Sequence, residues 1–320
     1  MSLFLGIDTS NYTTSLALYK SESQTYISKR KVLEVKKGQK GLRQSEALFL
    51  HIKNLPELMR ELFAQLEGDV GAIGVSLTPR DIEGSYMPCF LAGSMLAESL
   101  AAFSHKPLYT SSHQAGHIFA ALLSADRLDL MNENFIAFHV SGGTTEVLLV
   151  KPKSPGDFKI KLIGATLDLN AGQAVDRVSH MLGLGFPGGP ELEKLAEKSK
   201  KKYKPTVPEK GLDCSLSGLE NLCLKMLESE QKPEDIARFC LDYIALTLDK
   251  MTKVAKNLYG DMPLLYTGGV MSNKLIGGYL ARRHDCIFAK PELSVDNAVG
   301  LALMACLRHE AVESPGECKI

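Results

Sequence analysis

The sequence predicts an α/β protein of two lobes, each built on a mostly parallel sheet that opens with an antiparallel hairpin. The length of 320 residues exceeds what a single hydrophobic core usually supports, so two domains are expected. FLGIDTSNYTTSLALYK (4–20) and FIAFHVSGGTTEVLLVK (135–151) share one form, an apolar strand, a short polar turn and an alternating strand. After each hairpin, strands alternate with helices, as in sheets of mostly parallel strands.

The order of elements in each half follows from hydrophobic periodicity. The first half predicts, in order, a strand (25–35), a long amphipathic helix (about 45–66), a buried strand (69–79), a small-residue helix (88–104), a strand (106–110) and a helix (111–125). The second predicts a strand (158–167), helices through about Ser229, a long helix (Pro233 to Leu258), a strand (262–270) with a following helix, a strand (286–291) and a last helix from Asp296. We therefore expect a first lobe at 1–130 and a second at 131–320, whose last helix (about 295–311) packs back onto the first.

Two such lobes imply a ligand held between two hairpin tips, where backbone N–H groups, hydroxyls and glycines grip phosphates. The predicted fold class is therefore the two-lobed actin-like or sugar-kinase-like fold, made from a duplicated hairpin-plus-α/β unit.

Composition limits the classes of partner. Lys+Arg and Asp+Glu number 37 each, so a polyanion site must be a local patch. No apolar run approaches the roughly 20 residues that span a bilayer, and no basic stretch precedes an apolar one at the N-terminus. Seven scattered cysteines without a CxxC pair indicate reduced thiols. We expect a cytoplasmic protein with no membrane partner.

His113 and His117 in SSHQAGHIFAALLSA lie four apart on a predicted helix, so both imidazoles leave one face. Either they bind a metal or they pack side by side. Asp296, at the start of the last helix, is a candidate third ligand, although Asp at that position is normally an N-cap. Two imidazoles and a carboxylate would bind Fe²⁺ or Zn²⁺ and leave positions open for a substrate.

Glycine pairs stand in HVSGGTTE (139–146), LGLGFPGGPELEKL (182–195) and YTGGVMSNKL (266–275). Each is either a tight loop or a place where backbone N–H groups meet an anion or an adenine ring. Asp168 is a candidate helix cap. Asp176 is a candidate for hydrogen bonds from a ribose or a polar substrate, or else forms a surface pair with Arg177.

Two basic clusters are candidate RNA contacts, or else a solvated edge strand and helix end. The first contains Lys29, Arg30, Lys31, Lys36, Lys37, Lys40 and Arg43 against one acid, Glu34. The second is KSKKKYKP (198–205), around Tyr203.

Seven motifs occur in the order and spacing of one family: LGIDTS, HQAGHI, VSGGTT, AGQAVDRVSHMLGLGFPGG, SLSGL, TGGVMSNKL and VDNA. The chain resembles the tRNA threonylcarbamoyladenosine transferases, once described as O-sialoglycoprotein endopeptidases. The resemblance covers nearly the whole chain and implies an actin-like fold. It implies metal ligands at His113, His117 and Asp296. It implies nucleotide or substrate contacts at His139, Val140, Ser141, Gly142, Gly143, Asp176, Gly189 and Asn273.

For this family the reaction is a metal-dependent transfer of a threonylcarbamoyl group from threonylcarbamoyl-AMP to the adenosine beside the tRNA anticodon. The resemblance therefore implies an acyltransferase with one divalent ion, an ATP- or AMP-containing substrate, tRNA as a partner and further subunits of a tRNA-modification complex.

The sequence departs from the family at its nucleotide-facing loops. Asn11-Tyr12-Thr13-Thr14 replaces an acidic turn, Pro79-Arg80 stands where a Gly-Pro-Gly loop is expected, Thr144 replaces a His and Glu220 a Lys. A non-catalytic ATP- or AMP-binding paralogue, acting as scaffold or sensor, is therefore the alternative. A metallopeptidase is disfavoured because HxxxH lacks the glutamate of HExxH enzymes.

Overall fold

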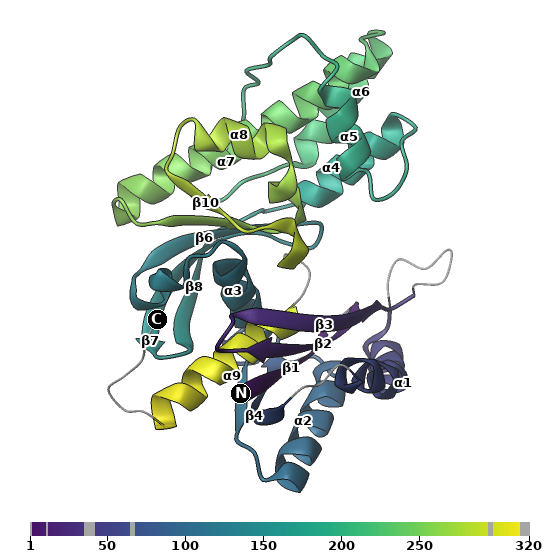
Figure 1. Cartoon of the computed structure of the whole chain (residues 1–320). Coiled ribbons are helices and arrows are strands. Elements are labelled where there is room, and N and C mark those ends of the chain that lie inside the picture. The colour runs from purple at the N-terminus through teal and green to yellow at the C-terminus, as the bar shows by residue number, and fades with distance from the viewer. Residues whose placement is uncertain (1, 11, 35–41, 65–67, 294–296, 314–320) are drawn as a thin grey trace. The chain divides into compact units, whose positions relative to one another are not determined.

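The computed structural model describes residues 2–10, 12–34, 42–64, 68–293 and 297–313 (Figure 1). The chain divides into two compact units. Unit 1 comprises Met1–Glu133, Pro152–Lys159 and Glu292–Ile320, and unit 2 comprises Asn134–Lys151 and Ile160–Pro291.

The described residues of unit 1 form a five-stranded sheet in the order β3-β2-β1-β4-β5. Its strands are β1 (Ser2–Ser10), β2 (Thr13–Lys20), β3 (Thr25–Val32), β4 (Asp69–Thr78) and β5 (Leu108–Ser112). The first three form an antiparallel meander, and β4 and β5 add on parallel to β1.

Helices cover both faces of this sheet. Alternate residues of β1 point to opposite sides and are buried on both, so each face needs a covering layer. They are α1 (Gln44–Phe63), α2 (Phe90–Ser104), α3 (His113–Ser124) and α9 (Asn297–Glu313), with a 3₁₀ turn η1 (Leu128–Asn132) after α3. Thr9 accepts a hydrogen bond from the N–H of Gly93 in α2, and on the other face Asp8 contacts His113 in α3.

The backbone of α9 packs directly on the sheet (Figure 1). A side chain at Gly6 would place its Cβ 1.9 Å from the carbonyl oxygen of Ala298, and one at Gly74 would lie 2.2 Å from that of Leu301. Asn297 to Leu307 are buried in α9, which explains why it is apolar on all sides.

Unit 2 repeats the strand plan of unit 1, in the order β10-β9-β6-β7-β8. Its strands are β6 (Phe135–Val140), β7 (Thr145–Ser154), β8 (Asp157–Ala165), β9 (Leu264–Thr267) and β10 (Cys286–Phe288). The β6–β7 pair is antiparallel, whereas β9 runs parallel to β6 and to β10. The duplication that the two hairpins predict is therefore present in the sheet topology.

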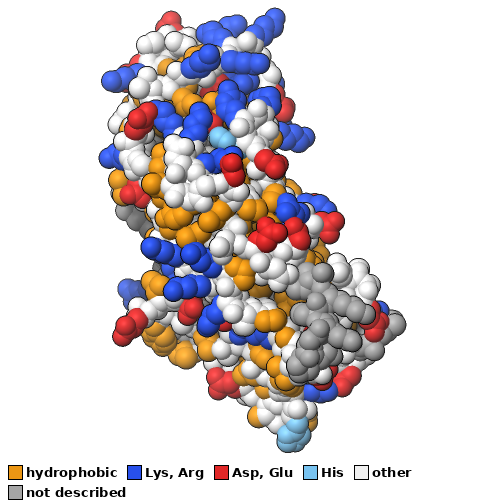
Figure 2. Space-filling view, turned by 90° about the vertical axis from the view of Figure 1, so that its left-hand side faces the viewer, with side chains coloured by type: hydrophobic (Ala, Val, Ile, Leu, Met, Phe, Trp, Pro, Cys, Tyr) orange, Lys and Arg blue, Asp and Glu red, His pale blue; other side chains and the backbone are white. Residues whose placement is uncertain are grey.

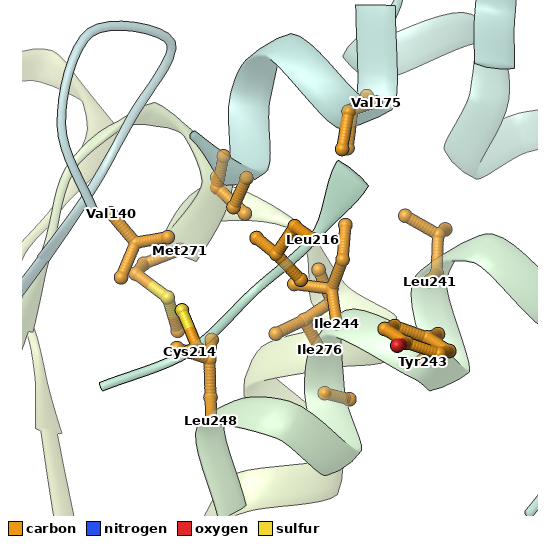
Figure 3. Close-up of a cluster of buried hydrophobic side chains, with 14 of the residues drawn as sticks. Val140, Val175, Cys214, Leu216, Leu241, Tyr243, Ile244, Leu248, Met271 and Ile276 are labelled. Atoms are coloured by element: carbon orange, nitrogen blue, oxygen red, sulfur yellow. The ribbon is translucent and has the colours of Figure 1, made fainter. Parts of the chain in front are cut away.

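Five helices belong to unit 2: α4 (Ala171–Met181), α5 (Gly189–Ala196), α6 (Ser217–Glu228), α7 (Pro233–Tyr259) and α8 (Lys274–Ala281), with 3₁₀ turns η2 (Gly269–Ser272) and η3 (Pro291–Leu293) nearby in the chain. Their apolar faces meet in one core, which contains Val175 of α4, Ile244 of α7 and Ile276 of α8. Val140 of β6 and Met271 of η2 belong to the same core (Figure 3). Burial of each large aliphatic side chain contributes about 1.5–3 kcal/mol.

Asp168 is not the cap of α4, contrary to expectation. Asn170 fills that position, in a capping box with Gln173. Asp168 instead accepts hydrogen bonds from the backbone N–H of Leu216 at 2.8 Å and from the hydroxyl of Ser217 at 2.6 Å, at the start of α6. Asp168, three residues before the first residue of α4, therefore binds a segment that is distant in sequence.

No helix in the described part of the chain combines the length and apolar character that crossing a membrane requires.

Candidate functional site

The two predicted metal-binding histidines lie together at the start of α3. Ser112 caps this helix by accepting a hydrogen bond from the N–H of Ala115. His113 and His117 follow one turn apart, and their ring centroids are 4.5 Å apart in an edge-on arrangement.

Asp8 is the acidic neighbour of this pair. Its side chain is buried at the end of β1, and its Oδ1 lies 3.1 Å from Nδ1 of His113. Burial alone raises the pKa of the Asp8 carboxyl, but the charge of His113 and hydrogen bonds from His113, Ser76 and Ser10 outweigh it and hold that pKa well below its usual range. The carboxylate therefore stays ionised beside the imidazole.

The start of α9 reaches the same place. The amide of Asn297 donates a hydrogen bond to the carbonyl oxygen of His113 at 2.8 Å and also contacts its ring nitrogen Nδ1. Asp296, the predicted third ligand, precedes Asn297 in the chain but lies outside the described residues. The sequence analysis did not identify Asp8 and Asn297 as neighbours of His113. For Asp8 the one indication in the sequence was an acidic residue within an otherwise apolar first strand.

The donor chemistry fits a divalent cation, although the described residues contain no cluster of three or more His, Cys, Asp or Glu that would complete a site. Two imidazoles share one helix face, and the Nδ1 of His113 faces a carboxylate. Metal-binding histidines typically use one ring nitrogen for the ion and the other for such a carboxylate. Nε2 of His113 is thereby the nitrogen that a metal would use.

A cavity of about 450 Å³ lies within unit 2. Val175, Leu241 and Ile276 line it and also belong to the hydrophobic core, so the core forms an apolar floor (Figure 3). Its volume is in the range of small-molecule and cofactor sites.

Asp176, Glu193 and Asn273 are among the polar side chains that line this cavity, and each also accepts hydrogen bonds from backbone N–H groups. Asp176 accepts a hydrogen bond from the N–H of Gly188 at 3.0 Å through Oδ1. Glu193 accepts one from the N–H of Lys274 at 2.7 Å through Oε1. Because a carboxylate offers about four acceptor positions, both retain capacity for a ligand. The sequence analysis did not identify Glu193, because other charged residues surround it on α5 and nothing in the sequence distinguishes it from them.

Asn273 caps α8, accepting hydrogen bonds from the N–H groups of Leu275 and Ile276, both at 3.0 Å. Its amide Nδ2 therefore remains a donor beside the cavity. The alternative of a surface pair between Asp176 and Arg177 is wrong, because Arg177 pairs with Glu220 at 2.8 Å.

The glycine pairs have different roles. A side chain at Gly142 or Gly269 would meet nothing within 4 Å, so the cavity is open beside both. Gly268 has φ +101°, and a Cβ there would lie 2.3 Å from the carbonyl oxygen of Val140. The backbone at Gly268 therefore requires glycine for structure, whereas Gly142 and Gly269 leave room for a ligand.

Four of the eight predicted nucleotide contacts line the cavity: Gly142, Asp176, Gly189 and Asn273. The other four do not line it. His139 and Val140 are buried in β6, whereas Ser141 shapes the turn by accepting hydrogen bonds from the N–H groups of Gly143 and Thr144.

The first basic cluster lies partly on the edge strand β3. Lys31 pairs with Glu57 at 2.6 Å, and Lys29 lies 4.0 Å from Glu61, both acids of α1. Arg30 is exposed on the same strand, and exposed Arg43 precedes α1. Lys36, Lys37 and Lys40 lie outside the described residues.

The strand plan, repeated in both units, is that of the actin-like, sugar-kinase-like fold, and solved structures agree. The activator of 2-hydroxyisocaproyl-CoA dehydratase from Clostridium difficile with bound ADPNP aligns with a TM-score of 0.56 at 14% identity, covering 99% of both chains. Component A of (R)-2-hydroxyglutaryl-CoA dehydratase from Acidaminococcus fermentans aligns with a TM-score of 0.58 at 16% identity, covering 97% of this chain and 99% of the other. The predicted fold class is confirmed.

The chain belongs to the tRNA N6-adenosine threonylcarbamoyltransferase family, whose model matches residues 26–303. The tRNA N6-adenosine threonylcarbamoyltransferase of Thermosipho melanesiensis is 31% identical over 316 residues, covering 94% of this chain and 93% of the relative. The predicted resemblance is thereby confirmed.

Proposed function

We propose that this protein transfers a threonylcarbamoyl group from threonylcarbamoyl-AMP to the adenosine beside the anticodon of tRNA. The observation that carries the proposal is the convergence of Gly142, Asp176, Gly189 and Asn273 on one cavity, in a chain of this family. In the reaction the N6 nitrogen of adenosine bonds to the carbamoyl carbon, the bond from that carbon to the phosphate oxygen breaks, and AMP and a proton leave.

The cavity suits the adenylate part of this donor. Its apolar lining, Val175, Val270 and Ile276 included, offers the base a surface to pack on. Asp176 and Glu193 retain acceptor positions for ribose hydroxyls. The open backbone at Gly142 allows a phosphate to approach closely.

The metal site belongs to the same proposal. His113, His117 and Asp296 would hold one Fe²⁺ or Zn²⁺, which when bound supplies a Lewis acid for the transferred group and its phosphate. The buried carboxylate of Asp8 orients His113, and Ser112 fixes the helix that carries both histidines.

The proposal also covers binding partners and cellular location. The protein binds tRNA and further subunits of a tRNA-modification complex, and it is located in the cytoplasm. The described residues of the first basic cluster, Lys29, Arg30, Lys31 and Arg43, are one candidate surface for tRNA.

Formation of threonylcarbamoyladenosine tests the proposal directly. Purified protein would be incubated with threonylcarbamoyl-AMP, unmodified tRNA and an extract from cells depleted of their own transferase, and the tRNA nucleosides analysed by mass spectrometry. We expect product with the wild type and a strong loss with Asp176→Asn. Absence of product, with AMP binding intact, would replace this proposal by the alternative.

That alternative is a non-catalytic nucleotide-binding paralogue acting as scaffold or sensor. One observation favours it: Glu220, where the family has a lysine, is neutralised by Arg177 at 2.8 Å, so α6 offers an acid–base pair instead of a free cation. Glu220→Lys is the variant that separates the two functions. It raises the rate of threonylcarbamoyl transfer if the protein is an enzyme that the absence of this lysine slows, and it produces no transfer if the protein is a non-catalytic paralogue.

A further inference from the structure

A lysine-rich segment of unit 2, residues 198–204, lies in the connection between α5 and α6. Five of its seven residues are lysines, all exposed, and none is acidic: Lys198, Lys200, Lys201, Lys202 and Lys204. Figure 2 shows Lys and Arg side chains gathered over the part of unit 2 at the top of that view. A chain whose acids and bases balance at 37 each therefore carries a local excess of positive charge here.

Buried carboxylates of α7 hold this segment, although it forms neither helix nor strand. The hydroxyl of Ser199 donates to Oδ1 of Asp235 at 2.5 Å, and the ammonium of Lys201 lies 2.8 Å from Oδ2 of the same residue. The N–H of Tyr203 donates to Asp242 at 2.8 Å.

The ring of Tyr203 adds a contact with α7, edge-on to Phe239 at 5.4 Å between centroids. Val207, only 2% exposed, anchors the following turn in the core. The segment is thus positioned before any ligand arrives.

The anchors and the unpaired lysines alternate. Ser199, Lys201 and Tyr203 make the contacts to α7, whereas the lysines at even positions are exposed. Lys198, Lys200, Lys202 and Lys204 have no carboxylate partner within 4.0 Å among the residues that the structure describes. A chain extends at most about 3.6 Å per residue, so the Cα atoms of these four lysines span at most about 22 Å.

The first basic cluster differs in this respect. Lys29 and Lys31 face Glu61 and Glu57 across the gap between β3 and α1. Lys31 also lowers the pKa of the Glu57 carboxyl, through a hydrogen bond and its charge. A phosphate that binds there must compete with carboxylates already in place.

We propose that the row Lys198, Lys200, Lys202 and Lys204 binds the phosphate backbone of tRNA. The inference rests on the proposed function, which makes tRNA the polyanion that the protein meets. Unpaired lysines at regular spacing bind phosphates without reading sequence and release counterions on binding. Because α7 holds the segment in place, little conformational freedom is lost when RNA binds.

The salt dependence of tRNA affinity tests this proposal. Each phosphate contact adds about 0.7–0.9 to the slope of log K against log salt, so changing all four lysines to Ala should lower that slope by about 3. We expect at least about 10-fold weaker binding of unmodified tRNA near 50 mM salt, measured by fluorescence anisotropy. AMP binding, which uses the cavity, should stay at the wild-type level.

The triple variant Lys106→Ala, Lys153→Ala, Lys256→Ala is the matched control, with an expected slope change below about 1 because each of its lysines already pairs with a carboxylate, at 2.6, 3.1 and 2.8 Å. The proposal is overturned if the quadruple variant keeps the wild-type slope, or if the triple variant alone changes it. It is also overturned if the quadruple variant loses binding to anionic phosphatidylglycerol vesicles but not to tRNA.

The same variants separate this proposal from the proposed function. Failure of transfer by the wild type, with a slope change in the quadruple variant, removes the enzyme but keeps the RNA contact. Normal transfer with an unchanged slope removes only the contact.

Discussion

The two units share one strand order but use their glycines in opposite ways. In unit 1, Gly6 and Gly74 lie against the backbone of α9, which closes the space over the sheet. In unit 2, Gly142 and Gly269 face open space at a cavity of about 450 Å³. The same topology therefore gives a sheet closed by α9 in unit 1 and a ligand-sized opening in unit 2, and the difference depends on whether a helix covers the glycines.

The largest expected effect comes from filling a closed glycine. Gly6→Ala places a methyl group 1.9 Å from the carbonyl oxygen of Ala298, so α9 must move. We expect a loss of roughly 3 kcal/mol or more in the free energy of unfolding, or failure to fold, measured by urea denaturation.

Gly142→Ala is the matched variant in unit 2, where a Cβ meets nothing within 4 Å. Its free energy of unfolding should stay within about 0.5 kcal/mol of the wild type, while AMP binding weakens. Equal destabilisation by the two variants would contradict the contrast between closed and open glycines.

Metal content tests the proposed metal site of unit 1. His117→Ala removes one of two adjacent imidazoles, so purified variant protein should retain little bound iron or zinc by mass spectrometry. His105→Ala, at the end of α2, should keep the wild-type content. The same metal content in all three proteins would remove the proposed site.

AMP affinity tests whether the cavity of unit 2 is a nucleotide site. Glu193→Gln keeps a carbonyl oxygen for the N–H of Lys274 but loses the negative charge beside the cavity. We expect about 10- to 100-fold weaker AMP binding by calorimetry, since hydrogen bonds to charged groups contribute about 1.5–3 kcal/mol. Glu191→Gln on the same helix, outside the cavity lining, serves as the control. Unchanged AMP affinity in Glu193→Gln would exclude this carboxylate from the nucleotide site.

The smallest expected effect comes from His51, which is buried on α1 in unit 1. Burial lowers the pKa of His51 to about 4, against a weaker opposite influence of the Asp8 charge. The unfolded chain, with a pKa near 6.5, then binds more protons between pH 6.5 and 4, so this stabilisation is complete above pH 6.5 and is lost as pH falls through that window.

The expected slope is about 1.4 kcal/mol per pH unit below pH 6. His51→Gln removes the titrating group, and its stability should fall less steeply over the same range in urea denaturation. Parallel pH profiles would show that His51 titrates alike in both states.

Several site features were predictable because they depend on short-range order. The HxxxH spacing placed two imidazoles on one helix face, and each Gly-Gly pair contributes one residue to the lining of the cavity, namely Gly142, Gly189 and Gly269. Glu193 and Asp8 were not predictable, because an acid on a charged helix and one in a strand look ordinary until the chain brings other groups to them. Asp168 was assigned to the wrong helix for the same reason, since its partners Leu216 and Ser217 lie 48 and 49 positions away.

The sequence by itself determined the duplicated α/β plan, the family and the pairing of histidines on α3, since periodicity and motif order are properties of neighbouring residues. Only the tertiary structure decided which glycines are covered, which carboxylates face the cavity and which lysines stay without a partner. Those outcomes depend on how segments distant in sequence pack together. A Cβ at Gly6 would lie 1.9 Å from a backbone oxygen of α9, whereas one at Gly142 would meet no atom within 4 Å.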